Sequence, residues 1–85
     1  MAKSDNLVNV KISTPTDVLW EGLAESVSSV NSQGPFDILA KHANFVTLVQ
    51  GEPISVRTDQ RERQYSFKNA VIHTDKDSVR IYGDV

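Results

Sequence analysis

Short runs in which valine and isoleucine alternate with polar residues constrain this 85-residue chain more than any other feature. The first run, LVNVKIS at residues 7–13, places Val8, Val10 and Ile12 on one face and polar side chains on the other. Alternation with a period of two is typical of a strand with one buried face. Valine and isoleucine together number 16 against five leucines, and branching at Cβ favours a sheet over a helix. The sequence therefore predicts an all-β domain.

Turn-forming residues divide the rest of the chain into similar short segments. Pro15 ends the first run, and the TPTD sequence at 14–17, which also fits a helix cap, favours a turn between two strands. Further strands are expected at residues 18–22, 23–30, 53–58, 65–74 and 79–82. Turns are expected at residues 31–35 (NSQGP) and 75–78 (DKDS), and a charged connection at residues 59–64. A change in the phase of the alternation predicts a bend or bulge near residues 69–70. This spacing suggests a sandwich or barrel. We expect a two-sheet β-sandwich of about ten short, mainly antiparallel strands.

The segment GPFDILAKHANFVT at residues 34–47 allows two interpretations. One face of a helix would be lined by Phe36, Leu39, Ala40, Ala43 and Thr47. The β-branched residues after the turn-former Asn44 instead favour two short strands around a tight turn at residues 40–44. We favour the two strands, which would place His42 in a turn.

The size of the chain limits it to one small domain, with residues 1–6 as a flexible N-terminus and residues 7–85 as the folded part. A domain of this size buries only roughly 60–65% of the surface of its unfolded chain, so we expect a bound partner to add to its stability. The chain has no cysteine, no apolar run near the ~20 residues that span a bilayer, and no signal-like apolar start. These features indicate a soluble, cytoplasmic protein. Its net charge of −2, with basic residues spread along the chain, argues against nucleic acid as a partner.

The sequence contains no recognisable catalytic, nucleotide or metal site. It has no glycine-rich phosphate loop, and His42 and His73 are far apart with no carboxylate at ligand spacing. The DKDS turn lacks the glycine and the final glutamate of a calcium loop. A general base at His42 would need an orienting group, and nothing singles out Asp37 or Ser32 for that role. We therefore expect no catalytic residue, no metal and no cofactor.

Two further features allow a structural or a binding role. Trp20, the only tryptophan, is expected to anchor the core or its edge, with a protein interface as the alternative. Four basic residues flank one predicted hairpin: Arg57, Arg61, Arg63 and Lys68. A solvated hairpin tip is favoured over a patch for an acidic partner because Glu62 lies within the cluster.

Taken as a whole, the chain resembles the N-terminal β-sandwich domain of the epsilon subunit of F-type ATP synthases, which is called delta in mitochondria. The resemblance covers about residues 7–84 and lies in three blocks: VKISTPTDVLWEGLAESVSSV, GPFDILAKHANFVT and YSFKNAVIHTDKDSVRIYGD. The second block is similar to the family's GEFGILPGHAPLLT, and the third to its FAVSGGFVEVKDNKVTVLAD. The order and spacing of the blocks agree with the family.

The chain also departs from the family pattern. Pro35 stands where the family has an acidic residue, and Asp37 stands where it has a glycine. Ala40-Lys41 takes the place of a Pro-Gly pair, and Asn44 takes the place of a proline. Asn69-Ala70 replaces a Gly-Gly pair, where Asn69 is expected to tolerate a left-handed backbone. The family continues into two regulatory C-terminal helices, whereas this sequence ends at Val85. It is either a natural short form or a domain cut from a longer chain, so inhibition by those helices does not transfer to it.

The resemblance implies a non-catalytic rotor domain that binds the gamma subunit and the polar loops of the c-ring, and lies peripheral to the membrane. The expected residues on the gamma side are Thr14, Lys41, His42 and Ala43. Those expected on the c-ring side are Asn31, Ser32, Gln33, Gly34, Pro35 and Asp37. Asp37 lies two residues beyond Pro35, on the same side of an extended segment, and is expected to replace the missing carboxylate. The alternative is a sandwich module that binds a protein outside any rotor.

Overall fold

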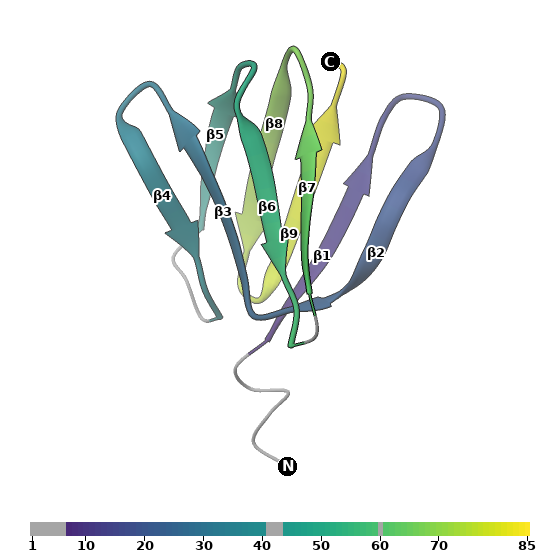
Figure 1. The fold of residues 1–85 in the computed structure, drawn as a ribbon, viewed down its shortest axis with the longest axis vertical. Helices are drawn as coiled ribbons and strands as arrows, with labels where there is room; N and C mark the ends of the chain where they lie inside the picture. The colour runs from purple at the N-terminus through teal and green to yellow at the C-terminus, as the bar shows by residue number, and fades with distance from the viewer. Residues whose placement is uncertain (1–6, 41–43, 60) are drawn as a thin grey trace.

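The structure is a computed structural model that describes residues 7–40, 44–59 and 61–85. These residues form nine strands in two sheets (Figure 1), against about ten expected. The strands are β1 (Val8–Ser13), β2 (Val18–Ala24), β3 (Ser26–Asn31), β4 (Gly34–Ile38), β5 (Phe45–Val49), β6 (Pro53–Arg57), β7 (Glu62–Ser66), β8 (Ala70–Asp75) and β9 (Ser78–Gly83). The all-β sandwich expected from the alternation is confirmed.

The first and last strands lie side by side in the larger sheet, whose order is β2-β1-β9-β8-β5. β1 and β9 run parallel, with Val10 beside Val79 and Ile12 beside Ile81, while the other neighbours are antiparallel. The smaller sheet has the order β4-β3-β6-β7 and is antiparallel throughout. The first and last strands thus pair within the same sheet.

Two strand boundaries differ from those expected, because the chain changes sheet there. The second strand does not end at Gly22 but continues to Ala24, and the chain bends at Glu25 to enter the other sheet. The Glu25 N–H donates to the Arg57 carbonyl across this bend, at 2.7 Å. The single strand expected at residues 65–74 is two strands, β7 and β8, joined by a bend at residues 68–69 where the chain passes between the sheets. The bend or bulge expected near residues 69–70 is therefore a bend.

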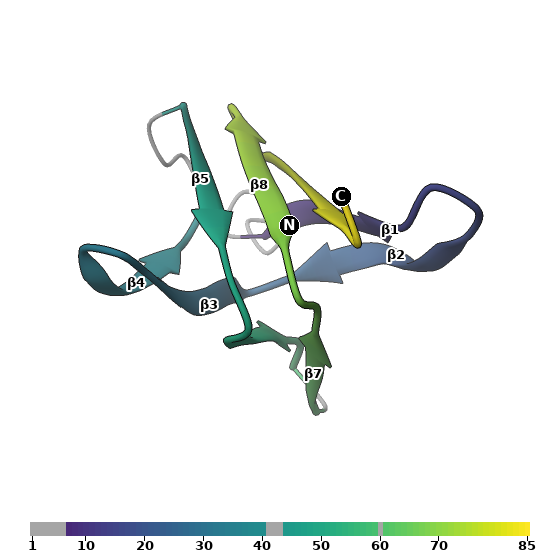
Figure 2. The ribbon, with the colours of Figure 1, turned by 90° about the horizontal axis from the view of Figure 1, so that it is seen from above.

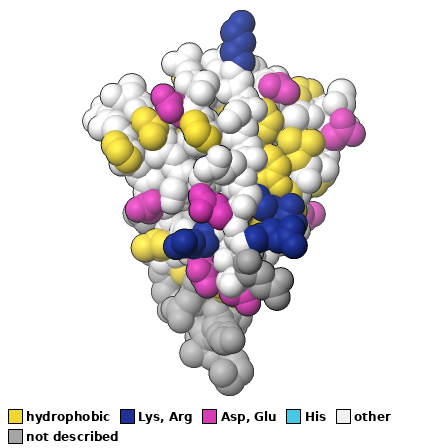
Figure 3. Space-filling model, in the orientation of Figure 1, with side chains coloured by type: hydrophobic (Ala, Val, Ile, Leu, Met, Phe, Trp, Pro, Cys, Tyr) yellow, Lys and Arg dark blue, Asp and Glu magenta, His cyan; other side chains and the backbone are white. Residues whose placement is uncertain are grey.

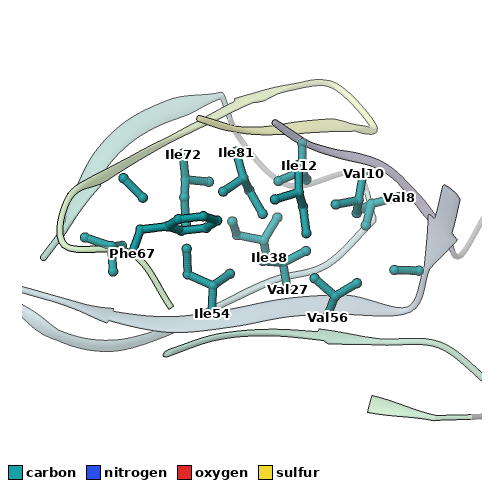
Figure 4. Packing of buried hydrophobic residues seen from close by; sticks show 14 residues of the cluster. Val8, Val10, Ile12, Val27, Ile38, Ile54, Val56, Phe67, Ile72 and Ile81 are labelled. Atoms are coloured by element: carbon teal, nitrogen blue, oxygen red, sulfur yellow. The ribbon is translucent and has the colours of Figure 1, made fainter. Parts of the chain in front are cut away.

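The core lies between the sheets and consists of the inward members of each alternation. Valine and isoleucine side chains from both sheets interdigitate there with Phe67 (Figure 4). The Phe67 ring lies against the backbone of Gly83, where an added Cβ would be 2.4 Å from the ring carbon Cε1. Close packing at this point explains why the last strand ends in glycine.

Aromatic side chains close the two sides of the sandwich. Seen from above (Figure 2), β4 and β5 lie at one side and β1 and β2 at the other. At the first side the rings of Phe36 and Phe45 meet edge to face, 6.1 Å apart. At the second side the Trp20 ring packs over Gly22, and the Arg63 guanidinium lies 5.6 Å from its centroid. Trp20 is half-buried against the core, so its expected role as an edge-of-core anchor is confirmed.

The segment around residues 34–47 forms strands rather than a helix. β4 ends at Ile38 and β5 begins at Phe45, as the favoured interpretation requires. Asp37, Asn69 and Ala70, which replace family glycines, all have ordinary negative φ angles, because the positive values among described non-glycine residues belong to Lys76 and Asp84. Asn69 therefore does not use the left-handed backbone that an asparagine tolerates, and these three residues add no backbone strain.

Candidate partner-binding surfaces

The hairpin between β3 and β4 holds the residues expected to face the c-ring. Asn31 pairs with Gly34, so Ser32 and Gln33 form the tip. The Asn31 side chain fixes this tip in two ways: its Oδ1 accepts from the Gln33 N–H at 2.8 Å, and its Nδ2 donates to Thr47 Oγ1 of β5 at 2.9 Å. Gly34 follows with a φ of 116°, which favours glycine. The tip is therefore held against both sheets.

Pro35 and Asp37 both lie exposed on the outer face of β4. The alternation along the strand is as expected, since Phe36 between them packs against the core. The carboxylate of Asp37 accepts a hydrogen bond from the Ser28 hydroxyl on the neighbouring strand β3. This bond orients the carboxylate near the hairpin but leaves it open to solvent.

Thr14 lies in the turn between β1 and β2, as expected. The Thr14 N–H donates to the Asp17 carbonyl at 2.8 Å, and the Asp17 N–H donates back to Thr14 Oγ1 at 3.2 Å. Thr16 Oγ1 donates to the Asp17 carboxylate at 3.1 Å. The TPTD sequence thus closes a turn, and the helix-cap alternative is excluded.

Lys41, His42 and Ala43, the other residues expected on the gamma side, lie outside the described residues. Asn44, which follows them, is tied to the turn between β8 and β9, because its Oδ1 accepts from the Lys76 N–H at 2.9 Å. Asn44 precedes β5, and Figure 1 shows the start of β5 at the end of that strand that points away from the turn at 14–17 and the β3–β4 hairpin. The turn that holds Thr14 and the β3–β4 hairpin thus share one end of the molecule, but Figure 2 shows them at its opposite sides.

The basic residues of the β6–β7 hairpin do not form one patch. Arg63 points inward onto Trp20, and Lys68 follows β7 at the other end of that strand. Arg57 and Arg61 share a shallow depression with three acidic residues: Glu25, Asp59 and Glu62. The solvated hairpin tip favoured from the sequence fits this mixture of charges better than a site for an acidic partner.

The described residues hold neither a group of metal ligands nor a membrane-spanning helix. Among them, no group of three or more His, Asp or Glu side chains is placed to hold a metal ion. Within residues 7–40, 44–59 and 61–85 there is also no helix of the length and apolarity needed to span a membrane.

The family assignment follows from a comparison of the sequence with known families. The family model for the beta-sandwich domain of the ATP synthase delta/epsilon chain matches residues 7–85. The chain belongs to this family. Its relatives include the ATP synthase epsilon chain of Clostridium novyi, 28% identical over 85 residues, and that of Sulfurimonas denitrificans, 27% identical over 73 residues. These matches cover 99% and 85% of this chain but only 63% and 56% of the relatives, so the chain spans little more than half of their length.

The delta/epsilon fold is also found in solved ATP synthases. A chain of the Euglena gracilis mitochondrial enzyme, from a structure of its OSCP, F1 and c-ring parts, superposes with a TM-score of 0.83. The match covers 91% of this chain and 50% of that one at 14% identity. A chain from the central stalk and c-ring of the Tetrahymena thermophila enzyme gives 0.73 at 10% identity, with 89% and 62% covered. At these identities the likeness shows the shared delta/epsilon sandwich fold.

Sequence reasoning did not single out the outer face of the five-stranded sheet. Val46, Leu48, Val71 and Tyr82 all point outward there, as their cross-strand pairing and exposure show. A signal was present, because these apolar residues occupy the positions of their strands at which alternation calls for polar side chains. It was missed because the strand order that brings them together is not visible in the sequence.

Proposed function

We propose that this domain is a non-catalytic part of the central stalk of an F-type ATP synthase, held between the gamma subunit and the c-ring. The match of the delta/epsilon family across residues 7–85 is the observation that carries the proposal. In this role the domain transmits rotation and performs no chemical step. A closely packed two-sheet core suits the task, because such interiors transmit strain with little deformation. The domain then lies in the cytoplasm, peripheral to the membrane that holds the c-ring.

The hairpin residues Asn31–Pro35 contact the polar loops of the c-ring in this proposal, and Asp37 supplies the carboxylate that Pro35 lacks. The cross-sheet hydrogen bond from Asn31 to Thr47 supports a contact role, since a fixed tip loses little entropy on binding. Thr14, Lys41, His42 and Ala43 contact the gamma subunit.

Co-purification tests the proposal. The tagged 85-residue chain is expressed with the gamma subunit and the c-ring of the same organism, solubilised in detergent, and captured. We expect gamma to be retained by the chain alone and the c-ring to be retained when gamma is present. Recovery of the chain without gamma would overturn the rotor assignment and favour a module for another partner.

Charge reversal separates the role of Asp37 from the rest of the proposal. Asp37→Lys is expected to weaken c-ring retention several-fold, because it removes a charge-assisted contact, while gamma is still retained. Asp59→Lys, at the hairpin between β6 and β7, is the matched control and should retain both partners. Equal c-ring retention by the two variants would remove Asp37 from the interface.

A further inference from the structure

The tip of the β3–β4 hairpin lacks the backbone geometry that holds most two-residue turns in place. Asn31 pairs with Gly34, so Ser32 and Gln33 form the loop. Two-residue loops that match the twist of their strands need a positive φ within the loop itself. Here neither loop residue has a positive φ, and the value of 116° belongs to Gly34 after the loop. The tip therefore depends on side-chain contacts for its shape.

The side-chain amide of Asn31 supplies these contacts from both of its ends. A backbone N–H can only donate, so the amide oxygen faces the Gln33 N–H, from which it accepts at 2.8 Å. The amide nitrogen then points to the other sheet, where it donates to Thr47 Oγ1 of β5 at 2.9 Å. Both bonds depend on the orientation of one planar group. If the nitrogen loses its acceptor, nothing keeps the oxygen on Gln33, because an unpaired half-buried donor turns toward water.

The strand that carries Thr47 is itself well fixed. β5 pairs with β8 along its whole length, and Val49 at its end is buried in the core. At its start the Phe45 N–H donates to Oγ1 of the buried Thr74 at 2.8 Å. The Phe45 ring also contacts Phe36, on the side of the sandwich where Figure 2 shows β4 and β5 together. Thr47 is thus a fixed acceptor that belongs to neither strand of the hairpin.

We propose that Thr47 is a positioning residue for the c-ring contact: it acts from the five-stranded sheet, through Asn31, to hold the tip of the β3–β4 hairpin in its binding shape. The inference rests on the proposed function, in which residues 31–35 contact the polar loops of the c-ring. A tip that is already ordered loses less conformational entropy on binding than a mobile one. Loss of the Thr47 hydroxyl therefore lowers the affinity for the c-ring although Thr47 lies outside the hairpin.

Substitution of Thr47 in the assembled complex tests the proposal. The 85-residue chain is bound to the gamma subunit of the same organism, and the affinity of this complex for the detergent-solubilised c-ring is measured by surface plasmon resonance. Thr47→Val keeps the branched shape but removes the acceptor, and is expected to weaken c-ring binding about threefold to tenfold with the affinity for gamma unchanged. Thr47→Ser keeps the hydroxyl and should bind like the wild type. Wild-type c-ring affinity in Thr47→Val, or a loss that Thr47→Ser shares, would overturn the proposal.

A matched control removes a side-chain hydrogen bond that does not join the two sheets. Gln64 Nε2 donates to Ser55 Oγ at 3.2 Å, between neighbouring strands of the four-stranded sheet. The two residues lie on its outer face, across which Figure 3 shows acidic and basic side chains interspersed. Gln64→Met should leave c-ring binding at the wild-type level. A loss equal to that of Thr47→Val would show that any missing side-chain hydrogen bond has this effect, and would contradict a specific role for Thr47.

A double-mutant cycle tests whether Thr47 acts through Asn31. Asn31→Ala removes the amide, so Thr47→Val in that background is expected to cause no further loss of c-ring affinity. Additive losses from the two substitutions would mean that Thr47 acts by another route, and the proposal would fail.

Amide hydrogen exchange in the chain alone addresses the tip without any partner. The Gln33 N–H is expected to exchange several-fold faster in Thr47→Val than in the wild type, because its bond to the Asn31 amide is released. Equal exchange rates would overturn the proposal whatever the binding data show. A wild-type complex with gamma that does not bind the c-ring would instead overturn the proposed function, and the Gln33 exchange rate would still decide whether Thr47 fixes the tip.

Discussion

Among the four glycines, Gly83 is the one at which the packing leaves the least room for a side chain. The Phe67 ring packs against the Gly83 backbone, and a Cβ added to Gly83 would lie 2.4–2.6 Å from three carbons of that ring. We expect Gly83→Ala to lower the free energy of unfolding by about 2–3 kcal/mol, because a buried ring must be displaced. Urea denaturation followed by circular dichroism measures the loss.

Two comparisons make the Gly83 prediction specific. Gly22→Ala meets Trp20 at 3.0 Å, but that ring is half-buried and can move, so a loss below about 1.5 kcal/mol is expected. In a Phe67→Leu background, Gly83→Ala should cost less than it does in the wild type, since the two changes share one contact. Additive losses would show that Phe67 is not the obstacle.

At the scale of elements, the edge strand β7 carries an inward-pointing arginine. Arg63 faces the core side of its strand and caps the Trp20 ring rather than entering solvent. Natural sheets use inward charges of this kind to prevent edge strands from pairing with other molecules. Arg63→Val is therefore expected to change the stability by less than about 1 kcal/mol but to promote edge-to-edge association.

Light scattering over a range of protein concentrations measures this association. Arg61→Val, in the turn that precedes the strand, is the control because its side chain is exposed and outside the ladder. A monomeric Arg63→Val chain at concentrations where the wild type is also monomeric would contradict a protective role for Arg63.

At the scale of the whole molecule, the fold depends on its last strand. β9 lies between β1 and β8, and residues 78–82 complete a parallel pair with residues 9–13. Removal of residues 78–85 is expected to unfold the domain, because it opens the centre of the larger sheet and removes Val79 and Ile81 from the core. Removal of the exposed Val85 alone should leave the thermal unfolding transition nearly unchanged. Far-ultraviolet circular dichroism and a thermal melt distinguish the two; a cooperative transition in the chain ending at residue 77 would contradict the prediction.

The sequence by itself was enough to predict the class of fold and most of its strands. Alternating residues such as Val8, Val10 and Ile12 report which face of a strand is buried, and that information is local. The turns at 14–17, 31–35 and 75–78 were predictable for the same reason, because glycine, proline, asparagine and aspartate act on the backbone near them. The resemblance of three blocks to the delta/epsilon family predicted the family that the comparison confirms.

The tertiary structure alone decided where the chain changes sheet and which outward residues become neighbours. At Glu25 the alternation gives no sign that the backbone passes to the other sheet, and near residues 69–70 the sequence predicted a bend but not a change of sheet. Leu48, Val71 and Tyr82 are separated along the chain and meet only because β5, β8 and β9 adjoin. The period of the alternation specifies which face of each strand is buried. The order of the strands is set by long-range packing of the core, and that order decides which side chains share a surface.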